Sequence, residues 1–292
     1  MAPKVVLITG CSCGLGLAEA VLLSTRFKHD FKVYATVLKL SDKGDLEAAA
    51  GDAINKNLFI REVDVTKTET IKALVDEIIR DNGRIDVVVN NAAVNGIDDP
   101  FFAKPLGSLD QAQAMMDVNF WGPAQVIKAV LPFMQEQKSG LIINTTSESG
   151  KTESPFIGLY AATKCALEGL SESLALVLRK AYNIRVVILE PGTFTSPMVV
   201  YSLSPEFQPE FLTTKWEESA KGMFSEFWHR DMRRLMMENQ APEEVARVVE
   251  EIILCDEPHL RYQSGPIITQ RLARKLRDPT GDSAFKAFQS ME

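Results

Sequence analysis

Short apolar runs rich in β-branched residues alternate along the chain with longer stretches in which apolar residues recur every three to four positions. The runs VVLI, VVV and VVIL are continuously apolar, which is typical of parallel strands that are buried on both faces. We predict six strands, at 4–9, 31–36, 58–63, 85–89, 141–146 and 184–189. Helical spacing predicts helices near 15–27, 67–82, 109–136 and 157–182, with a weaker one near 43–53.

This alternation of strands and helices predicts an α/β fold: a Rossmann-like, doubly wound parallel sheet with helices on both faces. No linker divides the first 195 residues, so we interpret residues 1–292 as a single domain. Residues 1–195 would form the cofactor-binding and catalytic core, and 196–240 a helical insertion over the substrate. The tail, 241–292, predicts a helix near 242–254, a short strand near 260–263 and a basic helix around 270–277.

Composition limits the classes of function. The 292 residues are 46% hydrophobic, and the net charge of −7 comes without a basic block, which argues against nucleic acid as the main partner. No apolar run approaches the roughly 20 residues of a membrane span, although peripheral membrane contact stays open. The N-terminus enters a strand pattern at once, so we expect a cytoplasmic protein. Four cysteines and three scattered histidines predict neither a disulfide framework, nor a metal site, nor a Ser-His-Asp hydrolase.

A glycine-rich turn joins the first predicted strand to the first predicted helix. Glycines let the backbone approach a ligand closely, and the start of a helix after a strand is where a dinucleotide pyrophosphate binds. The G-x-x-x-G-x-G spacing therefore predicts a dinucleotide site, with an ordinary tight turn as the alternative. The residues expected to contact the cofactor here are Thr9, Gly10, Ser12, Cys13, Gly14, Leu15 and Gly16.

The ends of the following strands are expected to complete this cofactor site. An acidic residue after the second strand would select NAD through the ribose hydroxyls, but Val37 and Leu38 stand there and Lys39 is the nearest cation. The sequence therefore slightly favours NADP over NAD. Residues after the third, fourth and sixth strands are suited to contact a cofactor, with plain turn chemistry as the alternative. They are Asp64, Val65, Asn91, Ala92, Ala93, Pro191, Gly192, Thr193, Phe194 and Thr195.

The stretch from Ser147 to Lys164 carries the candidate chemistry. Tyr160 and Lys164 are four residues apart, so a helix places both on one face, at the margin of an apolar stripe. A lysine held close to a phenol would favour the phenolate and lower the pKa of Tyr160 from about 10 towards neutrality. Such a phenol could donate and accept protons at physiological pH. The alternative is an ordinary helix whose Tyr and Lys extend to solvent.

Two further features bear on the site. Asn119 stands inside the long predicted helix, where an amide is poorly favoured, and we expect it either to bend the helix or to hold a water. Residues 196–238 are rich in Met and aromatic side chains, which predicts either a lid over an apolar substrate or plain packing. Met198, Phe224 and Trp228 are the candidate substrate contacts there.

Taken together, the glycine turn, NNAA, Asn119, Ser147, Tyr160-x-x-x-Lys164 and Pro191-Gly192 resemble the short-chain dehydrogenases/reductases. The segments YAATKCALEGLSESLA, PEEVA, HLRY and RDPTG look like the branch that holds estradiol 17β-dehydrogenases and photoreceptor retinol dehydrogenases. The resemblance covers nearly the whole chain and is weakest between about 196 and 238.

This resemblance implies a role for each matching residue. Tyr160 would exchange a proton with the substrate oxygen, Lys164 would hold the nicotinamide ribose, and Ser147 would bond the substrate oxygen. Asn119 would anchor a water that joins Lys164 to solvent. The implied reaction interconverts an alcohol and its carbonyl compound with NAD(P) on a small apolar substrate, with a steroid first, a retinoid second and another terpenoid or lipid third. The resemblance also implies a homodimer formed through the helices near 109–136 and 157–182.

The sequence departs from that branch at several positions. Ala93 replaces the usual glycine, Leu38 replaces an arginine after the second strand, and Glu148 and Ser154 stand where the branch tends to be apolar. Glu148 and Ser154 are therefore further candidate substrate contacts, and the substrate could be more polar. Two other functions remain open: a non-catalytic cofactor-binding regulator, disfavoured by the intact Ser147, Tyr160 and Lys164, and a nucleotide-sugar epimerase, disfavoured by the glycine spacing.

Overall fold

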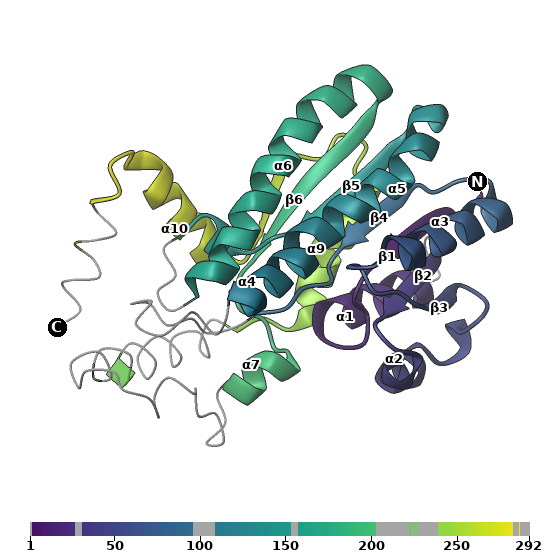
Figure 1. Ribbon diagram of the computed structural model, residues 1–292, viewed down its shortest axis with the longest axis horizontal. Coiled ribbons are helices and arrows are strands. Elements are labelled where there is room, and N and C mark those ends of the chain that lie inside the picture. The colour runs from purple at the N-terminus through teal and green to yellow at the C-terminus, as the bar shows by residue number, and fades with distance from the viewer. Residues whose placement is uncertain are drawn as a thin grey trace.

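A parallel sheet forms the centre of the computed structural model, which describes residues 2–26, 31–95, 109–152, 157–202, 222, 225–226, 239–282 and 286. Its seven strands lie in the order β3-β2-β1-β4-β5-β6-β7, and each neighbouring pair is parallel. The doubly wound α/β fold expected from the alternating pattern is confirmed (Figure 1). The strands are β1 (Lys4–Ile8), β2 (Phe31–Val37), β3 (Leu58–Glu62), β4 (Val87–Asn90), β5 (Gly140–Thr145), β6 (Ile184–Pro191) and β7 (Arg261–Ser264).

Helices cover both faces of the sheet and bury two apolar clusters. One cluster packs α1 (Gly14–Thr25), α2 (Gly44–Ala50) and α9 (Pro242–Leu254) against the sheet. The other packs α3 (Thr68–Asn82), α5 (Gly122–Gln137) and α6 (Gly158–Tyr182) against the opposite face. The strands are continuously apolar because helices bury both faces of the sheet. Neighbouring residues of one strand therefore pack in different clusters, as Val5 and Val6 do.

The long helix predicted near 109–136 has a break in its hydrogen-bond pattern. It divides into α4 (Leu109–Met116), a π-helical turn (Asp117–Trp121) and α5. The π turn contains Asn119, the position at which we expected either a bend in the helix or a bound water. At the junction, a Cβ on Gly122 would lie 2.9 Å from a Val65 methyl, so a glycine lets the helix approach the end of β3.

Two predicted boundaries differ from the observed ones for identifiable reasons. The strand predicted at 85–89 is observed at Val87–Asn90, and Ile85 lies outside it because Gln137 accepts from the Ile85 N–H at 3.0 Å and donates to its carbonyl at 2.9 Å. The basic helix predicted at 270–277 begins earlier, as α10 (Pro266–Arg277), where Gly265 has φ +99 and a proline can start a helix. Short helical pieces occupy Leu40–Asp42, Gly51–Ala53 and Glu148–Gly150.

The C-terminal elements extend the sheet and lie beyond one end of it. β7 pairs with β6, α9 packs on α1, and α7 (Pro197–Ser202) follows β6. Figure 1 shows α7 and α10 beyond one end of the sheet, while α5 and α6 run beside each other across a face. Within the described ranges, no helix combines the length and the apolarity needed to cross a membrane.

Candidate active site

The glycine turn after β1 adopts a backbone that requires glycine at two points. Gly10 and Gly14 have φ values of +73 and +57, in the left-handed region. A Cβ on Gly10 would lie 2.7 Å from the Ala92 Cα, and a Cβ on Gly16 would lie 2.3 Å from the Gly10 carbonyl oxygen. The turn is therefore pressed against the segment after β4, and side chains at these positions would push the two apart.

Hydrogen bonds fix the turn in this position. Thr9 Oγ1 accepts from the backbone N–H groups of Asn91 and Ala92, both at 3.0 Å. Asn91 Nδ2 in turn donates to the carbonyls of Thr9 and Gly10 at 3.0 Å. Thr9 and Asn91 thus tie two strand ends together, and contact of Asn91 with a cofactor stays a prediction.

The N-terminus of α1 suits a dinucleotide pyrophosphate. Cys13, which precedes the helix, is exposed and makes no side-chain cap, and the first turn contains no acidic residue. The early N–H groups of α1 are therefore available to an anion, and the backbone is close enough for phosphates to reach it. Leu15 is only 2% exposed and packs in the core, so its side chain is structural and only its backbone can face a cofactor. Ser12 is half-buried beside it.

The adenosine end of the predicted cofactor site is less distinctive. Leu38 is 56% exposed, and Val65 is buried against Gly122. Asp64 Oδ1 accepts from the N–H and hydroxyl of Thr66 at 2.9 and 2.7 Å, which is turn chemistry. Sequence reasoning missed Glu62, which lies opposite Val37 in the β2–β3 pairing and accepts from the Leu40 N–H at 2.9 Å. A carboxylate therefore does stand beside the end of β2, supplied by the neighbouring strand.

Ser147, Tyr160 and Lys164 come together, and Tyr160 and Lys164 share a helix face as their spacing predicted. Ser147 follows β5, and its Oγ accepts from the Ser149 N–H at 3.1 Å and bonds the Tyr160 side chain. Tyr160 lies in the first turn of α6, and Lys164 follows one turn later with its Nζ 5.5 Å from the Tyr160 ring centroid. The Lys164 side chain is 2% exposed, and its Nζ donates to the Thr145 carbonyl at 3.0 Å.

The protonation of this group differs from the expectation. Burial raises the pKa of Tyr160 to about 12, and the hydrogen bond from Ser147 offsets part of that increase. Burial also lowers the pKa of Lys164 to about 8. The structure thus reverses the expected fall of the Tyr160 pKa, because desolvation of the phenol outweighs a lysine whose ammonium bonds Thr145 instead.

Asn119 links the segment after β4 to α6. Its Oδ1 accepts from the Val94 N–H at 2.8 Å, and its Nδ2 donates to the Val94 carbonyl at 2.8 Å and to Thr163 Oγ1 at 3.1 Å. The side chain is fully buried. Its amide is therefore engaged with protein groups, and Thr163, next to Lys164, is a supporting residue that sequence reasoning missed. The water-anchoring role predicted for Asn119 stays a prediction.

The turn after β6 lies beside the glycine turn, at the carboxyl end of the sheet. Backbone bonds from Thr195 to Gln240 and from Gln240 to Thr193, at 3.0 and 3.1 Å, pin this turn to the segment before α9. A Cβ on Gly14 would lie 3.6 Å from the Ser196 Cβ and 3.9 Å from the Phe194 ring. The turns after β1 and β6, both predicted to contact the cofactor, therefore face each other. Pro191 is buried, Gly192 is half-buried and Ala93 is exposed.

The predicted substrate contacts are only partly described. Glu148 directly follows Ser147, and its carboxylate pairs with Arg271 of α10 at 2.6 Å. Ser154, Phe224 and Trp228 lie outside the described residues, and Met198 belongs to α7. Arg271 was missed because nothing local in the sequence connects α10 with the residue after Ser147.

Comparison with known proteins gives a consistent result. Residues 4–206 match the family model described as short chain dehydrogenase. Retinol dehydrogenase 8 of Bos taurus is 34% identical over 281 residues, which cover 96% of this chain and 87% of that protein. Estradiol 17-beta-dehydrogenase 1 of Rattus norvegicus is 34% identical over 292 residues, covering 98% and 81%. A short chain dehydrogenase/reductase from Burkholderia phymatum, solved in complex with NAD, superposes with a TM-score of 0.75 at 22% identity, covering 96% of this chain and 97% of that one.

Proposed function

The chain belongs to the short-chain dehydrogenase family, and we propose that it interconverts a secondary or allylic alcohol and its carbonyl compound on an extended apolar substrate. It is an oxidoreductase of a family whose related members act on alcohol groups. A steroid is our first expectation for the substrate, a retinoid the second, and another terpenoid or lipid alcohol the third.

One observation carries the proposal: Ser147, Tyr160 and Lys164 converge at the edge of the sheet where the glycine turn opens. With a pKa of about 12, Tyr160 is a neutral phenol at physiological pH and can donate its proton to a carbonyl oxygen. In the opposite direction the phenolate, left when the phenol has given up its proton, accepts the proton of the alcohol. Ser147 bonds the Tyr160 side chain and offers its hydroxyl to the same substrate oxygen, stabilising charge as it develops.

Lys164 and Asn119 support this pair. The Lys164 ammonium is held by the Thr145 carbonyl on the buried side of Tyr160, where its positive charge favours the phenolate as the proton leaves. Asn119 fixes Thr163, and therefore the helical turn that carries Lys164, against the segment after β4. Tyr160 and Lys164 thus share one face of α6, while Ser147 meets them from the end of β5.

The glycine turn, the open N-terminus of α1 and the facing turn after β6 fit a nicotinamide dinucleotide, and the residues from Thr9 to Gly16 would hold its pyrophosphate. When bound, the nicotinamide supplies the hydride chemistry. We keep NADP slightly ahead of NAD on the exposed Leu38 and the nearby Lys39, while Glu62 acts in the opposite sense because a carboxylate repels a 2′-phosphate.

We also propose a cytoplasmic homodimer that associates through the α4–α5 and α6 helices. Leu176 and Val177 on α6 are 77% and 60% exposed, and Trp121 beside α5 is 50% exposed. These apolar side chains support a helical contact between two copies. The residues 1–195, 196–240 and 241–292 would act as core, substrate cover and C-terminal extension of one domain.

The test is turnover of a panel of steroids, retinoids and terpenoid alcohols with NADP(H) and NAD(H), using wild type and Tyr160→Phe. The matched control is Tyr182→Phe, at the far end of the same helix. We expect one class to turn over, with a loss of roughly 10²- to 10⁴-fold in kcat for Tyr160→Phe and little change for the control. Cofactor binding without turnover of any panel member would contradict the substrate proposal, and equal activity in both variants would contradict the role of Tyr160.

A further inference from the structure

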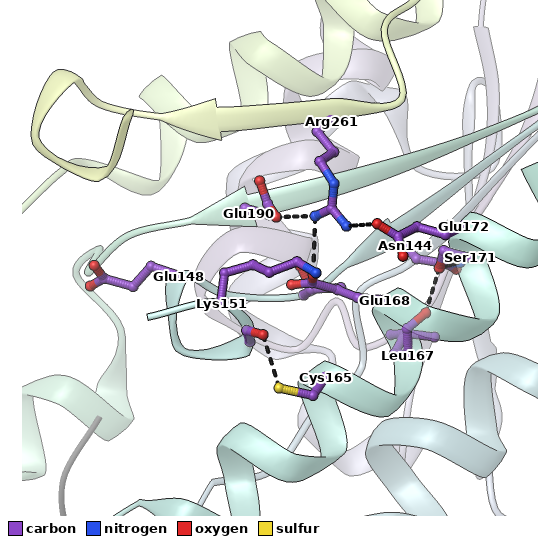
Figure 2. A network of polar contacts seen from close by, with 12 residues as sticks. Asn144, Glu148, Lys151, Cys165, Leu167, Glu168, Ser171, Glu172, Glu190 and Arg261 are labelled. Carbon is purple, nitrogen blue, oxygen red and sulfur yellow. Dashed lines mark hydrogen bonds and ion pairs between the residues drawn. The ribbon is translucent and has the colours of Figure 1, made fainter. Parts of the chain in front are cut away.

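A single guanidinium on the edge strand β7 joins carboxylates from two other elements (Figure 2). Arg261 Nη1 donates to Glu168 of α6 at 3.0 Å and to Glu190 of β6, and its Nη2 donates to Glu172 of α6. Gln263, two residues along the same strand, donates to the other oxygen of Glu190. Glu168 and Glu190 are each 1% exposed, whereas Glu172 is 46% exposed, so two of the three carboxylates that Arg261 bonds are buried.

The same cluster reaches the loop that follows Ser147. Lys151 Nζ pairs with Glu168 Oε2 at 3.0 Å, and Cys165 Sγ donates to the Gly150 carbonyl at 2.9 Å. A Cβ on Gly150 would lie 2.5 Å from Glu168 Oε1 and 3.3 Å from the Lys164 Cβ. The loop is therefore packed directly against the turn of α6 that begins at Lys164. Glu168 is the point where loop and helix meet.

The cluster also bonds the end of β6, through the Glu190 carboxylate. Glu190 is the residue before Pro191 and Gly192, which open the turn that faces the glycine turn. Arg261 thus contacts, directly or through Glu168, the three segments that carry Ser147, the pair Tyr160–Lys164, and the Pro-Gly turn.

The charge balance makes Arg261 the central member. In the described part of the chain, three carboxylates of the cluster share two cations, Arg261 and Lys151. Burial raises the pKa of Glu190, and the hydrogen bond from Gln263 and the positive charge of Arg261 oppose that increase. The planar guanidinium directs donors from two nitrogens in fixed directions to all three carboxylates, a geometry that the compact ammonium of a lysine does not reproduce.

We propose that Arg261 is a positioning residue that fixes the loop after Ser147 against α6 and so sets the hydrogen bond between Ser147 and Tyr160. Its expected effect on turnover rests on the proposed function, whereas its effect on the loop does not. A displacement of the Ser147 hydroxyl by about 1 Å is enough to lower the rate by roughly 100-fold.

The test compares Arg261→Met with Arg179→Met. Arg179 is a matched control, because it pairs with Glu257 at 2.5 Å and so also joins α6 to the segment before β7. Arg179 lies far along α6 from Lys164. The measurements are amide hydrogen exchange of residues 147–152, cofactor affinity by fluorescence, kcat and KM, and the pH profile of kcat.

For Arg261→Met we expect faster exchange at 147–152, kcat lower by roughly 10- to 100-fold, and cofactor affinity within about threefold of wild type. The limb of the pH profile that reports Tyr160 should move to higher pH, because a weakened bond from Ser147 no longer lowers the pKa of the phenol. Arg261→Lys should recover only part of kcat. Arg179→Met should match wild type in all four measurements.

Two outcomes overturn the inference. In the first, Arg261→Met is less heat-stable than Arg179→Met, yet its amide exchange at 147–152 and its pH profile equal those of Arg179→Met. That result would show a purely structural role for Arg261. The second outcome applies if Arg261→Met does not fold, in which case Lys151→Met is measured instead. This variant removes only the ion pair between the loop and Glu168, and unchanged amide exchange at 147–152 together with unchanged kcat would overturn the inference. A wild type that turns over no substrate defeats the proposed function alone, because the exchange experiment still tests the loop.

Discussion

Glu19, in α1, offers a sharp test of the electrostatics of this fold. The side chain is fully buried, and neither carboxylate oxygen has a hydrogen-bond partner in the part of the chain that the structure describes. Burial raises its pKa to about 8. A carboxyl group in this position folds in its neutral form and resists ionisation.

The sign of the resulting pH dependence follows from the two protonation states. Between pH 4.5, the ordinary value, and about 8, the folded protein keeps a proton on Glu19 that the unfolded chain loses. The free energy of unfolding therefore falls as pH rises through this window. At about 1.4 kcal/mol per pKa unit, the loss is about 1 kcal/mol at pH 5, about 3 kcal/mol at pH 7 and about 4 kcal/mol at pH 8.

Glu19→Gln removes the ionisation and keeps the shape of the side chain. We expect the variant to match wild type within about 1 kcal/mol near pH 5 and to exceed it by about 3 kcal/mol at pH 7, measured by urea unfolding across pH 5–8.5. Glu251→Gln, at an exposed position of α9, is the control and should show little change. A difference between Glu19→Gln and wild type that stays constant with pH would refute the reasoning.

Further predictions concern the candidate site. Lys164→Met should abolish turnover yet raise the free energy of unfolding by about 1–2 kcal/mol at pH 7, because burial lowers the lysine pKa to about 8 and the lost bond to Thr145 offsets only part of the gain. The gain should fade between pH 8 and 10.5, where the folded lysine has lost the proton that the unfolded lysine keeps. A variant that is destabilised at pH 7 would contradict this prediction. Asn119→Leu should lower the free energy of unfolding by about 2–4 kcal/mol, because it removes three hydrogen bonds of a buried amide, one of them to the buried Thr163 hydroxyl; a loss below about 0.5 kcal/mol in urea unfolding would contradict this. Gly16→Ala should abolish cofactor binding in a fluorescence titration, because its methyl group would meet a carbonyl oxygen at 2.3 Å, and unchanged affinity would show that the turn does not hold the cofactor. Glu62→Gln should raise affinity for NADP relative to NAD by roughly threefold to tenfold, and an unchanged ratio would remove Glu62 from the cofactor site.

Local patterns predicted those features of this protein that depend on local chemistry. The strands could be predicted because a strand buried on both faces is continuously apolar, and VVLI and VVIL are short β-branched runs of that kind. Tyr160 and Lys164 share a helix face for a purely geometric reason, and the structure keeps that arrangement. The family assignment followed from the order of such motifs and agrees with the comparisons.

Features that depend on distant contacts could not be predicted in this way. The pKa of Tyr160 has the opposite shift to the expected one, because spacing reveals the neighbouring lysine but not the degree of burial. The Arg261 cluster unites β7, β6 and α6 across 71 to 93 residues of sequence, a separation at which no local pattern exists. Leu15 likewise looked like part of the glycine turn although its side chain is a core residue.

The π turn at Asp117–Trp121 has a consequence for how this chain can change in length. It adds the equivalent of one residue to a helix, and each residue rotates the remainder of that helix by about 100°. Because the wide turn takes up the extra residue, that rotation is not passed on to α5. Deleting one residue of the turn would close it into a regular helix and leave the buried face of α5 in place, but the Asn119 amide would lose the position from which it bonds Val94 and Thr163. We therefore expect related sequences that keep this amide to keep the length of the turn as well.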